Sequence, residues 1–300
     1  MLLKEAIESL NLKSAGVYVD ATFGRGGHTL KILEQLGDQG RLLVVDRDWD
    51  AIAVANQMQA RDSRLLVAQG RFGDLVNLVR DAGLQKVDGV LMDLGVSSPQ
   101  LDDPSRGFSF RYDSPLDMRM DVRSGETAGE WLNQAEEAEM SKVFWRLGEE
   151  RYARRIARQI VNARPLETTS QLVVAIERGQ PSRDKNKHGA TRVFQAIRMH
   201  INQESEELIA GLNAAFEILA VGGRLAVISF QSIDDRCVKQ TFKHLSKPAE
   251  LPRRLPVRAD TLEAAPAKLI VKRKRASVIE SRDNPRARTA LLRVVEKVHE

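Results

Sequence analysis

Short apolar runs alternate with helical patterns along most of the chain, which is typical of an α/β protein. The runs at 17–20, 41–46, 65–68, 87–95 and 224–230 are nearly continuous in apolar residues. Strands buried on both faces of a parallel sheet have this composition. The segments 3–12, 29–36 and 204–219, and one starting near Asp50, place apolar residues at helical spacing. We therefore predict a doubly wound, Rossmann-like sheet, followed by two antiparallel edge strands at 268–271 and 289–295.

This pattern is interrupted in the middle of the chain. From about Ala128 to Ile201 the apolar positions keep helical spacing without a strand signal, and a long polar loop with three prolines precedes them at 96–121. Loops of this length at a ligand edge usually carry function. We predict a first core part at 1–100, an inserted loop and helical substrate-recognition subdomain at 101–203, and a second core part at 204–300.

A turn with three glycines follows the first strand, at Gly24, Gly26 and Gly27. Glycine lets the backbone turn with positive φ and approach a ligand closely, so we expect a nucleotide-type ligand there. The alternative is a turn that is glycine-rich for steric reasons alone. Asp46 ends the second strand twenty residues after Gly26, the distance at which an acid accepts hydrogen bonds from ribose hydroxyls. Alternatively, the Asp46 side chain caps the N-terminus of the next helix.

Two further residues at this edge are candidates. Asp93 lies at the carboxyl end of the fourth strand, which faces the ligand crevice in open α/β sheets. Phe72 follows the third strand and either packs on an adenine face or belongs to the core.

Composition and charge narrow the class of protein. The chain has 300 residues and 42% hydrophobic content without a run of membrane-spanning length, and its N-terminus lacks a secretory pattern, so we expect a cytoplasmic protein. One cysteine excludes an internal disulfide, and the histidines do not fall at metal-ligand spacing, so we expect no metal. Residues 251–300 carry 13 Lys/Arg against 6 Asp/Glu, whereas the preceding 250 carry 33 against 35. This basic end indicates phosphate neutralisation, with a solvated basic edge as the alternative.

Several ordered blocks of sequence resemble the bacterial 16S ribosomal RNA cytosine-N4 methyltransferase family, small-subunit methyltransferase H. The resemblance covers nearly the whole chain. The blocks lie at 22–28, 46–48, 93–102, 106–110, 115–120, 148–151, 190–198 and 284–288.

The resemblance implies a class I methyltransferase sheet and S-adenosyl-L-methionine as cofactor. It also implies a decoding-centre cytidine of 16S ribosomal RNA, cytidine 1402, as the methyl acceptor. The partner is then 16S ribosomal RNA within the small ribosomal subunit, without a membrane, and a homodimer is compatible with the sequence. The implied cofactor residues are Gly26, Gly27, His28, Asp46, Phe72, Asp93 and Gln100. His28 reads as a neutral imidazole at a helix N-terminus, facing the cofactor's carboxylate.

Chemistry suggests how the acceptor is held. Cytosine N4 is a weak nucleophile, so positioning by hydrogen-bond acceptors is expected to outweigh strong-base catalysis. Ser98 and Pro99 resemble the motif with which amino-group methyltransferases hold such a nitrogen, through a side-chain oxygen and a backbone carbonyl. Asp117 is a second candidate acceptor, or a loop brace paired with Arg119 or Arg111.

Aromatic and basic residues are candidates for RNA binding. Phe108 or Phe110 could stack on a splayed-out cytosine. The predicted phosphate contacts are Arg151, Arg154, Arg155, Arg286 and Arg288, each with a solvated surface as its alternative.

Two other classes of protein were weighed. A nicotinamide-dependent oxidoreductase would share the loop and the ribose acid, but the dinucleotide pattern lacks its third glycine. A non-catalytic RNA-binding or assembly protein would use the same basic residues, and the complete set of cofactor residues argues against it.

Overall fold

The computed structural model describes residues 1–181, 188–248 and 264–299. The chain forms two compact units, which we describe separately: Met1–Gly95 with Glu206–Glu300, and Val96–Ser205. We call them the sheet unit and the helical unit. Residues 251–263 of the predicted basic end lie outside the described residues.

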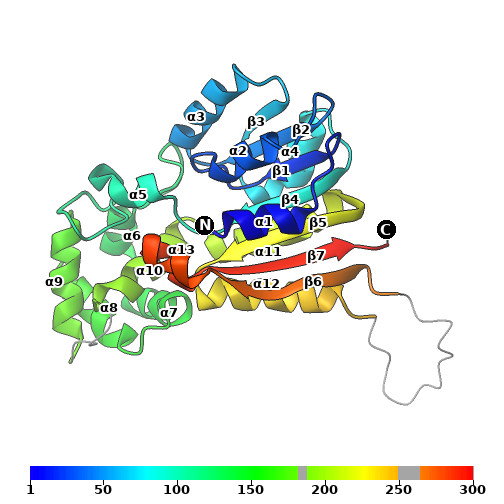
Figure 1. The fold of residues 1–300 in the computed structure, drawn as a ribbon. Coiled ribbons are helices and arrows are strands. Elements are labelled where there is room, and N and C mark those ends of the chain that lie inside the picture. The colour runs from blue at the N-terminus through cyan, green and yellow to red at the C-terminus, as the bar shows by residue number, and fades with distance from the viewer. Residues whose placement is uncertain (182–187, 249–263, 300) are drawn as a thin grey trace, which may run out of the picture. The chain divides into compact units, whose positions relative to one another are not determined.

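A seven-stranded sheet forms the centre of the sheet unit (Figure 1). Its order is β3-β2-β1-β4-β5-β7-β6. The first five strands are parallel, β7 is antiparallel to β5, and β6 is antiparallel to β7. The predicted fold class and the predicted antiparallel edge pair are therefore confirmed. The strands are β1 Val17–Asp20, β2 Arg41–Asp46, β3 Leu65–Gln69, β4 Val87–Asp93, β5 Leu219–Ser229, β6 Ala267–Arg275 and β7 Leu291–Lys297.

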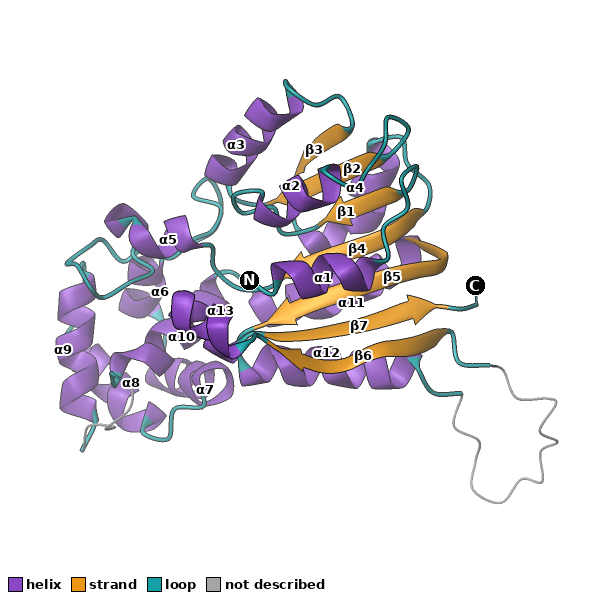
Figure 2. Cartoon of the chain, in the orientation of Figure 1, coloured by secondary structure: helices purple, strands orange, loops and turns teal. Residues whose placement is uncertain are grey.

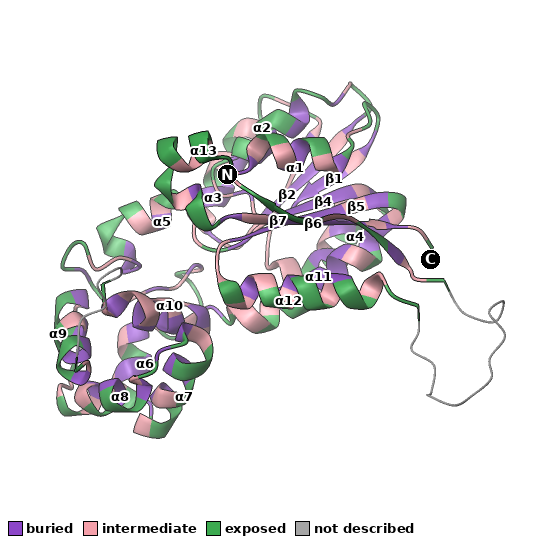
Figure 3. Ribbon diagram, turned by 60° about the horizontal axis from the view of Figure 1, so that its bottom comes forward, coloured by how far each residue is buried: buried purple, intermediate pink, exposed green. Residues whose placement is uncertain are grey.

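Helices cover both faces of this sheet (Figure 2). Leu42 and Val44 of β2 pack into one buried cluster, while Leu43 and Val45 pack into another. Alternate residues of a strand point to opposite faces, so a strand buried on both faces must be apolar throughout. β1, β2, β4, β5 and β7 are accordingly buried along most of their length, whereas the edge strand β6 is mostly exposed (Figure 3). The helices are α1 Leu3–Leu10, α2 Gly27–Leu33, α3 Trp49–Gln59, α4 Leu75–Asp81, α11 Glu204–Ile218, α12 Ser232–Leu245 and α13 Val278–Asp283.

Two strands are longer than the apolar pattern predicted. β5 begins at Leu219 rather than Arg224, because Leu219 already pairs with Val87 before a shift of register. β6 was expected to end at Val271, but its pairing with β7 continues to Arg275. The basic cluster therefore lies on an edge strand, where exposed charged side chains are tolerated.

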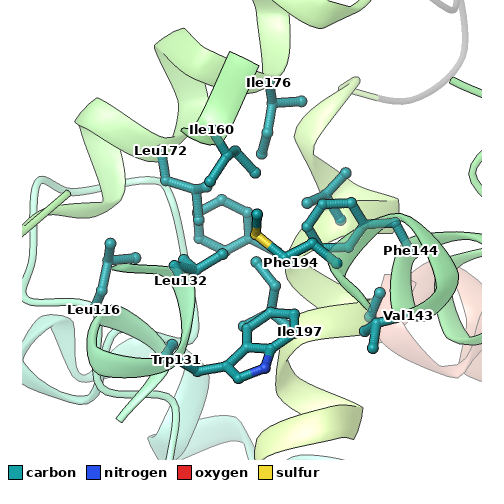
Figure 4. Packing of buried hydrophobic residues seen from close by; sticks show 14 of the residues in the cluster. Leu116, Trp131, Leu132, Val143, Phe144, Ile160, Leu172, Ile176, Phe194 and Ile197 are labelled. Carbon is teal, nitrogen blue, oxygen red and sulfur yellow. The ribbon is translucent and has the colours of Figure 1, made fainter. Parts of the chain in front are cut away.

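Five main helices enclose the core of the helical unit, which contains Trp131, Phe144 and Phe194 (Figure 4). The helical pattern starting at Ala128 was expected to be continuous, but it is divided into α6, α7 and α8. The break after α7 occurs at Glu149, whose left-handed φ of 49° ends the helix. The elements are α5 Ser98–Asp102, η2 Pro104–Arg106, α6 Ala128–Gln134, α7 Glu137–Gly148, α8 Ala153–Asn162, α9 Thr169–Gly179 and α10 Ala190–Ile201.

Candidate active site

The glycine turn connects β1 to α2 in the sheet unit. Gly24 and Gly26 have positive φ, 55° and 77°. A Cβ on Gly26 would lie 2.9 Å from the Phe23 ring and 3.0 Å from Met58 Sδ, so packing alone requires glycine there. A Cβ on Gly27 would meet nothing within 4 Å. The steric alternative therefore accounts for Gly26 but not for Gly27, which borders open space at the start of α2.

Asp46 at the end of β2 is bonded to this turn. Its Oδ2 accepts the Gly24 N–H at 2.8 Å, and its Oδ1 accepts the Asp48 N–H at 2.9 Å. A carboxylate has about four acceptor sites, so Asp46 can still accept a hydrogen bond from a further donor. Burial raises the pKa of Asp46, and backbone hydrogen bonds from Asp48, Gly24 and Arg47 oppose that shift. The α3 cap is Asp48, which accepts the Asp50 N–H, so the capping alternative for Asp46 is wrong.

Asp93 at the end of β4 is held on the same edge. Its N–H donates to Thr22 Oγ1 at 2.6 Å, which joins the ends of β1 and β4. Its side chain is 21% exposed, but Oδ1 is buried and has no hydrogen-bond partner among the described residues. Burial raises the pKa of Asp93 to about 7.

His28 lies beside Asp93, with Nδ1 3.8 Å from Asp93 Oδ2. Its Nε2 is 3.2 Å from the Met1 carbonyl oxygen. Burial lowers the pKa of His28 to about 4, so the ring is neutral near pH 7. A neutral imidazole is the form that the sequence-based prediction requires.

Sequence reasoning did not assign Asp20 to this edge. Asp20 ends β1, is buried, and accepts hydrogen bonds from Thr29 Oγ1 at 2.7 Å and the Thr22 N–H at 3.2 Å. Burial raises the pKa of Asp20 to about 6. Gln231 directly follows Phe230 after β5, and its buried Oε1 has no partner among the described residues. The signal for Asp20 was present, because its strand ends in an acid just as β2 and β4 do.

Phe72 lies in the short helix η1, Phe72–Asp74, and packs against α11. A Cβ on Gly211 would lie 2.3 Å from the Phe72 ring, so the ring contacts that glycine closely. The side chain is only partly buried. Packing against the core thus occupies one part of the ring, while its role toward an adenine stays a prediction.

These residues fit the predicted cofactor. S-adenosylmethionine carries an ammonium and a sulfonium cation together with ribose hydroxyls. The edge supplies the carboxylates of Asp20, Asp46 and Asp93, and Asp93 Oδ2 also lies 4.0 Å from the Met1 ammonium group. A buried carboxylate with a raised pKa is stabilised in its charged form by a nearby cation. The unpartnered oxygens of Asp93 and Gln231 would accept hydrogen bonds from such a ligand.

The candidate amino clamp lies at the start of α5 in the helical unit. Ser97 precedes α5, and its N–H donates to Gln100 Oε1 at 2.9 Å. The buried Gln100 therefore caps this helix, and its role toward the cofactor stays a prediction. Ser98 is exposed. The Pro99 carbonyl accepts the Asp103 N–H at 2.9 Å, so a bond to a base would use its second lone pair.

Asp117 forms a bidentate pair with Arg119 in the same loop. Arg119 Nε donates to Oδ1 at 2.8 Å and Nη2 donates to Oδ2 at 2.8 Å. Burial raises the pKa of Asp117, but the hydrogen bonds from Arg119 outweigh it and lower the pKa overall. This is the brace alternative, with Arg119 rather than Arg111 as the partner.

The two candidate stacking residues differ in exposure. Phe108 is 6% exposed in the core of the helical unit, with the Arg106 guanidinium 5.8 Å from its ring centre. Phe110 is only partly buried, with its ring 5.0 Å from that of Phe194 and 4.8 Å from that of His188. In this conformation Phe110 suits base stacking better than Phe108.

The predicted RNA-binding arginines lie on two different units. Arg151, Arg154 and Arg155 are exposed at and near the start of α8 in the helical unit. Arg286 and Arg288 lie on η4, Pro285–Thr289, between α13 and β7 in the sheet unit, with Arg288 exposed. Their contacts with RNA stay predictions.

A parallel sheet with a glycine turn after its first strand, and acids after its first, second and fourth strands, defines a Rossmann-like nucleotide-cofactor enzyme. Residues 1–298 match the model of the MraW methylase family, and the chain belongs to this family. The predicted family is therefore confirmed, and with it the cofactor, S-adenosylmethionine.

Related proteins align with this chain over nearly their whole length. Ribosomal RNA small subunit methyltransferase H of Dechloromonas aromatica is 48% identical, covering 99% of this chain and 97% of that protein. The protein of the same name from Thiobacillus denitrificans is 50% identical, covering 100% and 97%. An rRNA methylase from Streptococcus thermophilus is a more remote structural neighbour, with a TM-score of 0.42 and 11% identity, covering 99% and 94%.

None of the helices in the described ranges is both long and apolar enough to cross a membrane. Within those ranges, no group of three or more His, Cys, Asp or Glu residues could hold a metal ion.

Proposed function

We propose that this chain transfers a methyl group from S-adenosylmethionine to the N4 amino nitrogen of a decoding-centre cytidine in 16S ribosomal RNA. Methylation of small-subunit ribosomal RNA is supported by the names of relatives that align over nearly the whole chain. The assignment of N4 as the methylated atom rests on one observation. The exposed Ser98 and the adjacent Pro99 begin the first helix after the strand that carries Asp93.

The cofactor-binding residues have separate roles. Asp46 accepts hydrogen bonds from the ribose hydroxyls, and its bond to Gly24 keeps the glycine turn in register with β2. Asp93 and Asp20 offer negative charge to the cationic part of the ligand. His28 stays neutral and therefore adds no positive charge near the sulfonium. When bound, the cofactor supplies an electrophilic methyl group.

The acceptor residues act by positioning. Ser98 Oγ and the Pro99 carbonyl accept hydrogen bonds from the two amino protons of cytosine, which turns the nitrogen lone pair out of conjugation. Phe110 stacks on the extruded base. Asp117 braces the loop through Arg119. The proton leaves after methyl transfer, when the amine has become acidic, so the mechanism requires no histidine base.

The substrate is the RNA within the small ribosomal subunit, and the enzyme acts in the cytoplasm. A non-catalytic RNA-binding protein is the second candidate, because the same arginines would serve it. The unpartnered oxygen of Asp93 favours the enzyme, since an RNA-binding protein without a cofactor has no use for it.

Two measurements test this proposal. Isothermal titration with S-adenosylmethionine and S-adenosylhomocysteine should show binding, and heat-denatured protein is the control. Small subunits from cells that lack this protein should then be incubated with the enzyme and cofactor, and their nucleosides analysed by mass spectrometry. We expect a new N4-methylated cytidine. Cofactor binding with methylation at a different atom would refute the N4 assignment alone, and folded protein that binds no cofactor would refute the enzyme.

A further inference from the structure

A row of cations lies along the outer face of α12 in the sheet unit. Arg236, Lys239 and Lys243 are exposed on α12, and Lys247, two residues beyond its end, is exposed as well. Spacings of three and four residues place the three helical cations on one face. At 1.5 Å per residue these three extend over about 10 Å. Exposed positions recur along α12 in Figure 3.

The acids of α12 lie on the other side. Asp234 is 5% exposed, and Asp235 accepts two hydrogen bonds from the buried Arg293 of β7, at 2.7 and 2.9 Å. Each exposed position that the structure describes on α12 is therefore basic or uncharged. The helix separates its charges, with acids inward and bases outward.

Other surface helices of the same unit have a different composition. The exposed face of α11 carries Glu206 and Glu217. Lys4 of α1 pairs with Glu8, and Lys31 of α2 pairs with Glu34. Lys239 and Lys243 have no acidic partner among the described residues. An ordinary solvated helix mixes both signs, so α12 departs from the surface around it.

The edge strand β6 continues this basic surface. α12 packs against β6, where Phe242 and Ala267 share one buried cluster. The exposed cations of β6 are Lys268, Lys272, Arg273, Lys274 and Arg275. β6 runs parallel to β5, and its last pairs, Lys274 with Leu292 and Arg275 with Leu291, are level with the end of β5. The basic surface therefore reaches the sheet edge that carries Asp93.

We propose that α12 and β6 bind the sugar–phosphate backbone of the substrate RNA, at a distance from the cytidine that reacts. This inference rests on the proposed function for the identity of the RNA. Contacts between cations and phosphates release counterions and carry no base specificity. The surface thus contributes affinity and orientation, while the choice of base belongs to the residues around Ser98.

The test measures RNA binding as a function of salt. We compare wild-type protein with the double variant Lys239→Ala, Lys243→Ala, using transcribed 16S ribosomal RNA. The control is Lys4→Ala, Lys86→Ala, which removes the same charge from two exposed lysines elsewhere on the sheet unit. A second variant, Lys239→Arg, Lys243→Arg, keeps the charge.

The slope of log affinity against log salt should fall by about 1.4 to 1.8 for the loss of two phosphate contacts. RNA affinity at moderate salt should drop about tenfold. The KM for RNA should rise, whereas kcat at saturating RNA and the affinity for S-adenosylmethionine should not change. The lysine control and the arginine variant should keep the wild-type slope.

Contrary results are clearly defined. A slope for the alanine variant equal to that of the control would overturn the proposal, as would wild-type protein that does not bind this RNA. Loss of binding to phosphatidylserine vesicles, with RNA binding retained, would assign the surface to a membrane instead. The slopes are measured without methyl transfer, so an enzyme that binds RNA but transfers nothing would refute the proposed function and leave this test intact.

Discussion

Asp93 in the sheet unit and Asp117 in the helical unit are both substantially buried acids, yet their surroundings differ. Asp93 has an oxygen without a partner, and burial raises its pKa to about 7. Asp117 has both oxygens bonded to Arg119, and these bonds lower its pKa. The Met1 ammonium group lies 4.0 Å from Asp93 Oδ2, while Oδ1 has no hydrogen-bond partner among the described residues. A folded protein retains such an incompletely paired acid only at a cost in stability. The surroundings of Asp93 therefore suit a ligand that brings positive charge, whereas Asp117 is already paired within its own loop.

Removing Asp46, the proposed ribose acid of the sheet unit, should have the largest effect of the changes compared here, and it should act on cofactor affinity. We expect Asp46→Ala to weaken S-adenosylmethionine binding at least a hundredfold, because two hydrogen bonds to a charged acceptor contribute about 3 to 6 kcal/mol. Asp46→Asn should be intermediate, since one amide oxygen can still accept. Titration calorimetry measures the affinity, and circular dichroism checks the fold.

The matched control is Asp38→Ala, which removes an exposed acid from the loop before β2. Its affinity for the cofactor should equal that of the wild type. An Asp46→Ala variant with unchanged affinity and a normal melting curve would remove Asp46 from the ribose site.

The dependence of folding stability on pH measures the cost of burying Asp20. Asp20 has a folded pKa of about 6 against 3.8 when unfolded. Between these values the folded protein keeps a proton that the unfolded chain has lost, so stability falls as pH rises. The fall is about 2 kcal/mol between pH 4 and pH 6.5. Asp20→Asn cannot titrate and should lack this contribution.

The measurement is urea unfolding of both proteins without cofactor across that range. The free energy of unfolding of the wild type, minus that of Asp20→Asn, should decrease with pH and then become constant. A difference that is flat or that increases would show that burial does not raise the pKa of Asp20.

The sequence predicted the sheet unit better than the helical unit, for a physical reason. The strands of the sheet unit are continuous apolar runs, and the glycines, Asp46 and Asp93 lie at their carboxyl ends, so periodicity and topology alone place them at one edge. In the polar loop, the spacing of residues along the sequence does not show that Gln100 caps α5 or that Phe108 is buried. It also does not show that Asp117 pairs with Arg119. Those outcomes depend on contacts between residues rather than on a repeated pattern. Asp20 was missed although its position at a strand end was visible.

The amino clamp gives a smaller effect on the helical unit. We expect Ser98→Ala to slow methyl transfer about tenfold to a hundredfold, in line with about 1 to 3 kcal/mol for one lost hydrogen-bond partner. Cofactor affinity should not change. Single-turnover assays with saturating RNA separate the chemical step from binding.

Ser105→Ala is the control, because it removes a hydroxyl of the same loop that donates to Asp103 Oδ1. It should react at the wild-type rate. Wild-type turnover in the Ser98 variant would refute the clamp.

Variants of Asp117 and Arg119 should give the smallest effect. They test whether the bonds to Arg119 satisfy the Asp117 carboxylate without a ligand. A brace predicts that Asp117→Asn and Arg119→Ala each lower stability, and that the double variant loses less than the sum. The coupling should be about 1 kcal/mol, because the pair is partly exposed. Denaturant unfolding of the four proteins measures it.

Turnover then separates the brace from an acceptor. If Asp117 only braces the loop, both single variants should slow transfer by similar factors, because each breaks the same pair. If Asp117 also accepts a hydrogen bond from cytosine, Asp117→Asn should slow transfer at least tenfold more than Arg119→Ala, which keeps the carboxylate. That result would place Asp117 beside Ser98 in the clamp, and the loop of the helical unit would then hold an acid used for chemistry, as the sheet unit does.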